Sequence, residues 1–166
     1  MRTIIIDDNA QAAQDLQDRL AKFEQIKVVG IASNGLDGLA MVSELQPDLL
    51  FLDVQLPDIS GLDFLERVDS FTHGGCRVVM FTAYDKFILP AIRKKAFDVL
   101  LKPIDNNELD IIMQRLDEEG LPLPKQNEQE VKDVDMRESN KFLLYTNTVD
   151  FKLVDKRDIA LFQYNH

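Results

Sequence analysis

The fold is decided by residues 49–61, which read LLFLDVQLPDISG. The unbroken apolar run Leu49–Leu52 favours a strand covered on both faces, as the strands of a parallel sheet are. Asp53 follows directly, and Pro57 and Gly61 then mark a turn that ends where a helix begins. The stretch therefore predicts a buried strand, an exposed polar loop and a helix in immediate succession.

The same order of strand and helix recurs through the first 118 residues. Five apolar runs are predicted to be strands, at 3–6, 27–31, 49–52, 78–81 and 99–101. Helical patterns occupy 10–23, 35–45, 61–68, 86–96 and 106–116. This (βα)5 alternation predicts an α/β domain, a doubly wound parallel sheet with right-handed crossovers and helices on both faces.

Composition limits the classes of protein to consider. The 166 residues, 45% of them hydrophobic, are enough to bury a core without disulfides or a membrane. Cys76 is the only cysteine, and the N-terminus has neither a signal peptide nor a membrane span, so we expect a cytoplasmic protein. The net charge of -10 argues against a surface that binds nucleic acid through its phosphates alone.

The last third of the chain differs from the rest. Residues 119–140 carry Pro122 and Pro124 among polar residues and are predicted to be a linker, partly helical near 131–136. Residues 141–166 are predicted to form a β-rich segment of three short strands. These strands are expected at 142–146, 149–153 and 159–164, with a turn at 147–148.

Polar residues follow four of the five predicted parallel strands in the first domain. Asp7 and Asp8 follow the first strand and Asp53 the third, while Thr82 and Lys102 follow the fourth and fifth. In open parallel sheets ligands bind at this edge. Crowded carboxylates repel one another unless a cation neutralises them, and an all-oxygen set suits Mg2+. With a hydroxyl and an ammonium, such a site favours phosphoryl transfer to an aspartate over hydride or acyl transfer. Each aspartate taken alone is better explained as a helix cap, but caps do not readily explain all of these polar residues together.

These residues lie in four motifs: IIDD at 5–8, LDVQLPDISGL at 52–62, FTAY at 81–84 and FDVLLKP at 97–103. Together the motifs resemble the receiver domain of two-component response regulators, over about residues 1–118. The resemblance implies a flavodoxin-like fold with strand order 2-1-3-4-5.

The resemblance also implies the roles of the acidic residues. Asp53 would accept a phosphoryl group from a sensor histidine kinase. Mg2+ would be held by Asp8, Asp53 and the main-chain carbonyl of Gln55, and Asp7 would hold a metal-bound water. The protein would not be an enzyme in the usual sense, beyond self-catalysed phosphoryl transfer and autodephosphorylation.

The remaining site residues follow from the same resemblance. Lys102 would contact the phosphoryl group, and Thr82 would move toward it on activation. The Lys102–Pro103 bond is expected to be cis. Val99 departs from the family pattern, because most receivers carry Tyr or Phe three residues before the lysine.

The segment 141–166 is similar to the opening strands of a LytTR-type DNA-binding domain. This similarity implies a transcriptional regulator, most of whose DNA-binding domain is expected to lie beyond this chain. We expect the full-length protein to bind DNA but not this fragment, since residues 141–166 carry a net charge of only +1. The open edges of its strands make a homodimer a further possibility.

Two other functions stay open at this stage. A haloacid-dehalogenase-like aspartyl-phosphate phosphatase needs a second Asp two residues after the nucleophile, where this chain has Gln55. A receiver that acts only as an unphosphorylated docking module is disfavoured by the intact acidic residues but permitted by Val99.

Overall fold

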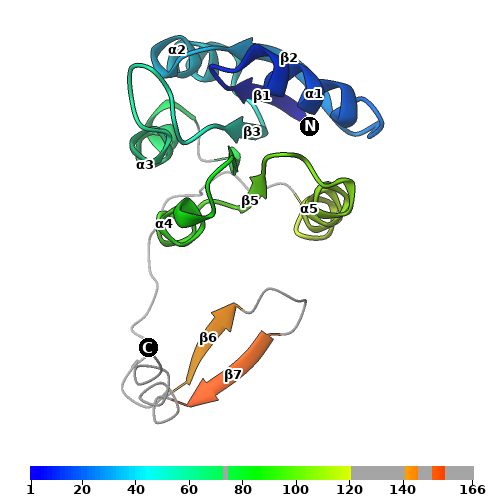
Figure 1. Cartoon of the computed structure of the whole chain (residues 1–166), viewed down its shortest axis with the longest axis vertical. Coiled ribbons are helices and arrows are strands. Elements are labelled where there is room, and N and C mark those ends of the chain that lie inside the picture. Colours follow the sequence, from blue (N-terminus) through cyan, green and yellow to red (C-terminus); the bar gives the residue numbers. More distant parts are fainter. Residues whose placement is uncertain (73–74, 121–140, 146–150, 156–166) are drawn as a thin grey trace, which may run out of the picture. The chain divides into compact units, whose positions relative to one another are not determined.

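The computed structural model describes residues 1–72, 75–120, 141–145 and 151–155. The chain divides into two compact units, Met1–Asn127 and Glu128–His166. The elements of the first unit, most of them labelled in Figure 1, are β1 (Arg2–Ile6), α1 (Ala10–Leu20), β2 (Lys27–Ala32), α2 (Gly35–Leu45), β3 (Leu49–Leu52), α3 (Gly61–Phe71), β4 (Arg77–Thr82), the 3-10 helix η1 (Asp85–Phe87), α4 (Ile88–Arg93), β5 (Asp98–Leu101) and α5 (Asn106–Glu118).

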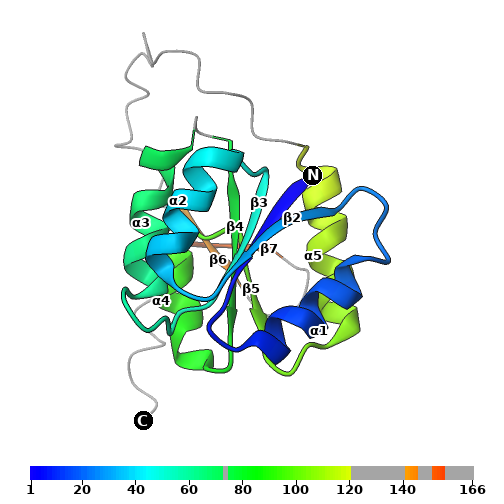
Figure 2. The same ribbon diagram turned by 90° about the horizontal axis from the view of Figure 1, so that it is seen from above.

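The five strands of this unit form one parallel sheet in the order β2-β1-β3-β4-β5. Helices α2, α3 and α4 cover one face of the sheet, and α1 and α5 cover the other (Figure 2). The predicted flavodoxin-like fold and its strand order are confirmed.

The central strands bury side chains on both faces, as their unbroken apolar runs predict. In β1, Ile4 and Ile6 belong to the hydrophobic cluster under α2 and α3, whereas Ile5 belongs to the cluster under α1 and α5. All three side chains are fully buried. Residues of β3 are likewise shared between the two clusters.

The helix predicted at 86–96 is present, but it is shorter than predicted and begins with a 3-10 turn. The structure has η1 followed by α4, which begins at Ile88 and ends at Arg93. Proline has no N–H to donate and clashes with the carbonyl four residues earlier, so it is tolerated only in the first turn. A start at Ile88 places Pro90 in that first turn. The helical stretch then ends, and Lys95 adopts a left-handed conformation with φ of 65°.

Other helix ends differ by a few residues from the predicted ones. Helix α1 stops at Leu20, although Phe23 still packs against the hydrophobic cluster below it. Helices α3 and α5 continue to Phe71 and Glu118, beyond the apolar residues that marked their predicted ends. Helix termini are the least predictable positions of an element, because capping and fraying decide them.

The second unit contains two described strands, β6 (Lys141–Tyr145) and β7 (Phe151–Asp155), which pair antiparallel. They correspond to the strands predicted at 142–146 and 149–153. The greater part of the predicted linker, the helix near 131–136, the turn at 147–148 and the strand at 159–164 lie outside the described residues. No helix in the described part of the chain has the length and apolar character needed to cross a bilayer.

Candidate functional site

The candidate site lies at the carboxyl edge of the parallel sheet, where the strand ends meet. The backbone N–H of Asp7 donates to the carbonyl of Ala32 at 3.0 Å, and that of Asp53 donates to Ile6 at 2.8 Å. The N–H of Lys102 donates to the carbonyl of Thr82 at 2.8 Å. These bonds continue the strand ladders by one residue, so the sheet itself fixes the backbone of the predicted site residues.

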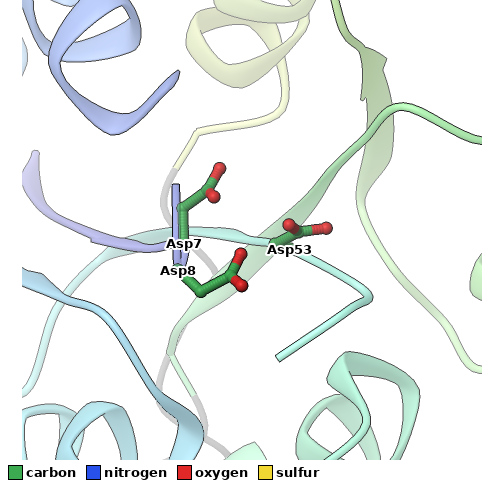
Figure 3. Close-up of side chains that lie close together, drawn as sticks. All are labelled: Asp7, Asp8 and Asp53. Carbon is green, nitrogen blue, oxygen red and sulfur yellow. The ribbon is translucent and has the colours of Figure 1, made fainter. Parts of the chain in front are cut away.

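Three carboxylates gather at this edge (Figure 3). One oxygen each from Asp7, Asp8 and Asp53 lies within 4.8 Å of the others. Asp7 is only 1% exposed and Asp53 6% exposed, whereas Asp8 is exposed. An all-oxygen donor set with this much negative charge fits a hard divalent cation such as Mg2+.

These aspartates do not cap helices. Helix α1 is capped by Asn9, whose side chain accepts a hydrogen bond from the N–H of Ala12 at 3.1 Å. Helix α3 is capped by Ser60, whose hydroxyl accepts from the N–H of Leu62 at 3.2 Å. The capping explanation for the acidic cluster is therefore not supported, and the carboxylates are free of that role.

Lys102 provides the positive charge of the site. Its ammonium lies 2.6 Å from an oxygen of Asp7 and 3.1 Å from an oxygen of Asp53. The same ammonium lies 4.6 Å from the centre of the Phe81 ring, a cation–π contact that the sequence did not predict. Lys102 thus offsets part of the carboxylate charge.

Burial raises the pKa of Asp7 above its ordinary value. Hydrogen bonds from Lys102 and from the N–H of Asn9 act in the opposite direction, and the negative charge of Asp53 adds to the rise. The folded protein therefore holds this carboxylate in an environment that disfavours its charge, which is typical of functional sites.

The residues next to Lys102 and Thr82 have defined places. Thr82 is fully buried, and its hydroxyl oxygen accepts a hydrogen bond from the N–H of Tyr84 at 3.3 Å. The Lys102–Pro103 bond is cis, in agreement with the expectation from the family. Val99 is half-buried in β5, pairs with Met80 of β4 and packs against the cluster under α2 and α3.

The loop from Asp53 to Gly61 is closed at its base. The N–H of Gly61 donates to the carbonyl of Val54 at 2.8 Å, and Gln55 and Ser60 form an antiparallel bridge. A side chain at Gly61 would lie 2.1 Å from the carbonyl oxygen of Asp53, so only glycine lets α3 approach this closely. The N–H of Gln55 also donates to the Asp53 carboxylate at 3.2 Å.

Sequence reasoning missed the part that Asp58 plays at the tip of this loop. The sequence places Asp58 in a turn, but the structure joins its carboxylate to the first residues of α2. No local signal points to this contact, because its partners lie more than twenty residues away along the chain.

Comparisons with known proteins agree with this geometry. The family model described as a response regulator receiver domain matches residues 3–114. An uncharacterized response regulatory protein of Vibrio cholerae is 43% identical over 116 residues, which are 70% of this chain and 48% of that protein. The transcriptional regulatory protein BtsR of Escherichia coli K12 is 33% identical over 164 residues, which are 96% of this chain and 64% of that protein.

A solved structure matches the same region. The response regulatory domain of protein mrkE from Klebsiella pneumoniae is similar with a TM-score of 0.66 and 28% identity, over 72% of this chain and 97% of that one. The chain spans about half the length of the Vibrio relative and about two thirds of BtsR. With its sheet order, its acidic edge and a family match over residues 3–114, this chain belongs to the response regulator receiver family.

Proposed function

We propose that this chain takes a phosphoryl group onto Asp53 from a sensor histidine kinase, in a reaction that depends on Mg2+. The observation that carries the proposal is the buried Asp53 carboxylate, which lies 3.1 Å from the Lys102 ammonium and within 4.8 Å of the oxygens of Asp7 and Asp8. A carboxylate nucleophile beside cationic charge is what phosphoryl transfer to an aspartate requires.

In the proposed reaction an oxygen of Asp53 forms a bond to phosphorus while the bond to the kinase imidazole breaks. The products are an acyl phosphate on Asp53 and a histidine that takes up a proton. Asp8, Asp53 and the main-chain carbonyl of Gln55 would hold Mg2+, with Asp7 holding a metal-bound water. Bound Mg2+ would supply positive charge that offsets the developing charge on the phosphoryl oxygens.

Two further residues complete the proposed chemistry. Lys102 would contact a phosphoryl oxygen with the ammonium that now lies against Asp7 and Asp53. Thr82 is fully buried at the end of β4, and its hydroxyl would sense the phosphoryl group. Transfer and later hydrolysis of the phosphoryl group would be the extent of the chemistry, so the protein is a signalling protein and not a metabolic enzyme.

We further propose that the output is transcriptional and of the LytTR type. The support is the similarity to BtsR, a transcriptional regulatory protein, over nearly the whole chain. In this proposal residues 1–118 are the receiver, 119–140 the linker and 141–166 the beginning of a DNA-binding domain. The full-length protein would then bind DNA in the cytoplasm, and its activity would follow the phosphorylation of Asp53.

The phosphatase alternative lacks its general acid, because Gln55 stands two residues after Asp53. The docking alternative has no need of Lys102 or of three clustered carboxylates, whose mutual repulsion costs stability. Phosphorylation is the function that makes use of all of them.

The test is intact-mass measurement after incubation of the protein with acetyl phosphate and Mg2+. We expect a gain of one phosphoryl group, no gain for Asp53→Asn, and no gain when EDTA removes the metal. Asp8→Ala is expected to need much more Mg2+. Equal phosphorylation of Asp53→Asn would show that the acceptor lies elsewhere.

A further inference from the structure

Asp58 joins two parts of the receiver that are distant in sequence. It lies in the β3–α3 loop, and its carboxylate accepts hydrogen bonds from the N–H groups of Gly35 and Leu36, both at 2.7 Å. It also accepts from the N–H of Ile59 at 2.9 Å. The tip of the loop is thereby attached to the first turn of α2.

These bonds fit the needs of the helix. The first N–H groups of a helix have no partner within it, and an anion there is favoured by the helix dipole. Asp58 takes the N–H groups of Gly35 and Leu36, while the cap residue Asn34 takes that of Asp37 at 2.8 Å. Desolvation opposes the charge of Asp58, but its backbone hydrogen bonds, among them those from Gly35 and Leu36, together lower its pKa below the ordinary value.

The loop also packs closely on α2 at the same point. A Cβ at Gly35 would lie 2.3 Å from a side-chain carbon of Ile59 and 3.1 Å from the carboxylate of Asp58. On another side the loop borders a hollow of about 410 Å³, lined by residues of the loop itself and by Phe87. The loop is held at its base by the Gln55–Ser60 bridge, and Leu56 packs against the hydrophobic cluster under α2 and α3. The bonds from Asp58 add the contact that fixes the tip of the loop against α2.

The base of this loop contains Gln55, whose backbone N–H donates to the Asp53 carboxylate at 3.2 Å. We propose that Asp58 is a positioning residue for the metal site: by fastening the loop to α2, it sets where the main-chain carbonyl of Gln55 lies relative to Asp53. The inference rests on the proposed function, in which that carbonyl and Asp53 hold Mg2+.

The experiment measures acetyl phosphate-dependent phosphorylation at increasing Mg2+ concentration. Asp58→Ala removes the bonds to α2, and we expect the half-saturating Mg2+ concentration to rise about tenfold, the usual effect of losing a group that orients metal ligands. The rate at saturating Mg2+ should stay nearly unchanged, because Asp53, Thr82 and Lys102 are untouched. A purely structural role would not separate these two quantities.

Two more variants make the test specific. Gly35→Ala keeps the charge of Asp58 but pushes Ile59 off the helix, so it should raise the Mg2+ requirement in the same direction. Asn34→Ala removes the other cap of α2 without touching the loop. It should lower the melting temperature while leaving the half-saturating Mg2+ concentration as in the wild type.

The outcomes separate the two proposals. If the wild type gains no phosphoryl group at any Mg2+ concentration, the proposed function fails and the role of Asp58 fails with it. If the wild type responds to Mg2+ and Asp58→Ala responds at the same concentration, the role of Asp58 alone is wrong. Equal shifts in Asp58→Ala and Asn34→Ala would also overturn it, since loss of helix stability would then be the cause.

Discussion

The ammonium of Lys102 lies 2.6 Å from an oxygen of Asp7, nearer than the 3.1 Å that separates it from Asp53. Asp7 follows β1 and Lys102 follows β5, and two strands of the sheet, β3 and β4, lie between these. The ion pair therefore joins the ends of two strands that are not neighbours, and the proposed acceptor Asp53 follows a strand that lies between them.

Lys102→Met should raise the pKa of Asp7 further. Burial already raises this pKa, whereas the hydrogen bond and the charge of Lys102 lower it. When both are lost, the effect of burial raises the pKa further. NMR titration of the Asp7 carboxyl carbon in EDTA measures the change. The exposed Lys22→Met serves as the control. An identical titration in Lys102→Met would mean that the ion pair does not form in solution.

Asp7→Asn should stabilise the metal-free protein at neutral pH. The pKa of Asp7 is raised in the folded state, so the stability linked to this group is present below its unfolded pKa and is lost as pH rises through the folded pKa. Stabilising replacements commonly gain about 0.5–2 kcal/mol, or a few degrees of Tm. Thermal melts in EDTA at several pH values should show a gain that shrinks toward acid pH. A loss of stability at neutral pH would contradict this.

Thr82→Ala should still be phosphorylated but should lose most of the change that phosphorylation produces. The hydroxyl does not form the new bond to phosphorus, and in the structure it accepts from the N–H of Tyr84. Losing that acceptor should cost about 1 kcal/mol of stability. Amide hydrogen exchange with and without beryllofluoride measures the response, and Thr82→Ser should retain it. A full response in Thr82→Ala would remove the role proposed for this residue.

Val99→Tyr should add an aromatic switch that the wild type lacks. Val99 is half-buried and packs against the cluster that contains Met80 and Ala91, so in the wild type any coupling there depends on packing. We expect a larger beryllofluoride-dependent change in amide exchange over α4, β5 and α5 in the variant. If exchange and self-association match the wild type, the departure at Val99 has no functional effect.

The 166-residue chain should not bind DNA specifically. Residues 141–166 carry four basic and three acidic side chains, too few cations to neutralise several phosphates. Electrophoretic mobility shift with promoter fragments at physiological salt checks this, and specific binding that resists salt would refute it.

Light scattering on this chain and on one ending at Glu118 shows whether residues beyond α5 cause any self-association.

The sequence predicted the sheet and the site because both depend on local patterns. Unbroken apolar runs such as Leu49–Leu52 mark buried parallel strands, and topology then brings the residues that follow them together at one edge. Helix ends were predicted less well. They depend on a single residue such as Pro90 or on a few hydrogen bonds at the caps. The contacts of Asp58 with α2 and of Lys102 with Phe81 were missed, since each depends on three-dimensional packing that no spacing reveals.

Ile4 and Ile6 belong to one hydrophobic cluster and Ile5 to the other, so the sheet divides the buried side chains into two sets. This division affects which buried residues can be exchanged together. Among the described residues, none belongs to both hydrophobic clusters. A change of side-chain volume under α1 and α5 is thus met by neighbours on that side, and the strand backbone separates it from α2, α3 and α4. A protein engineer can therefore exchange the buried residues of one face as a set with those of a relative while keeping the opposite face as it is.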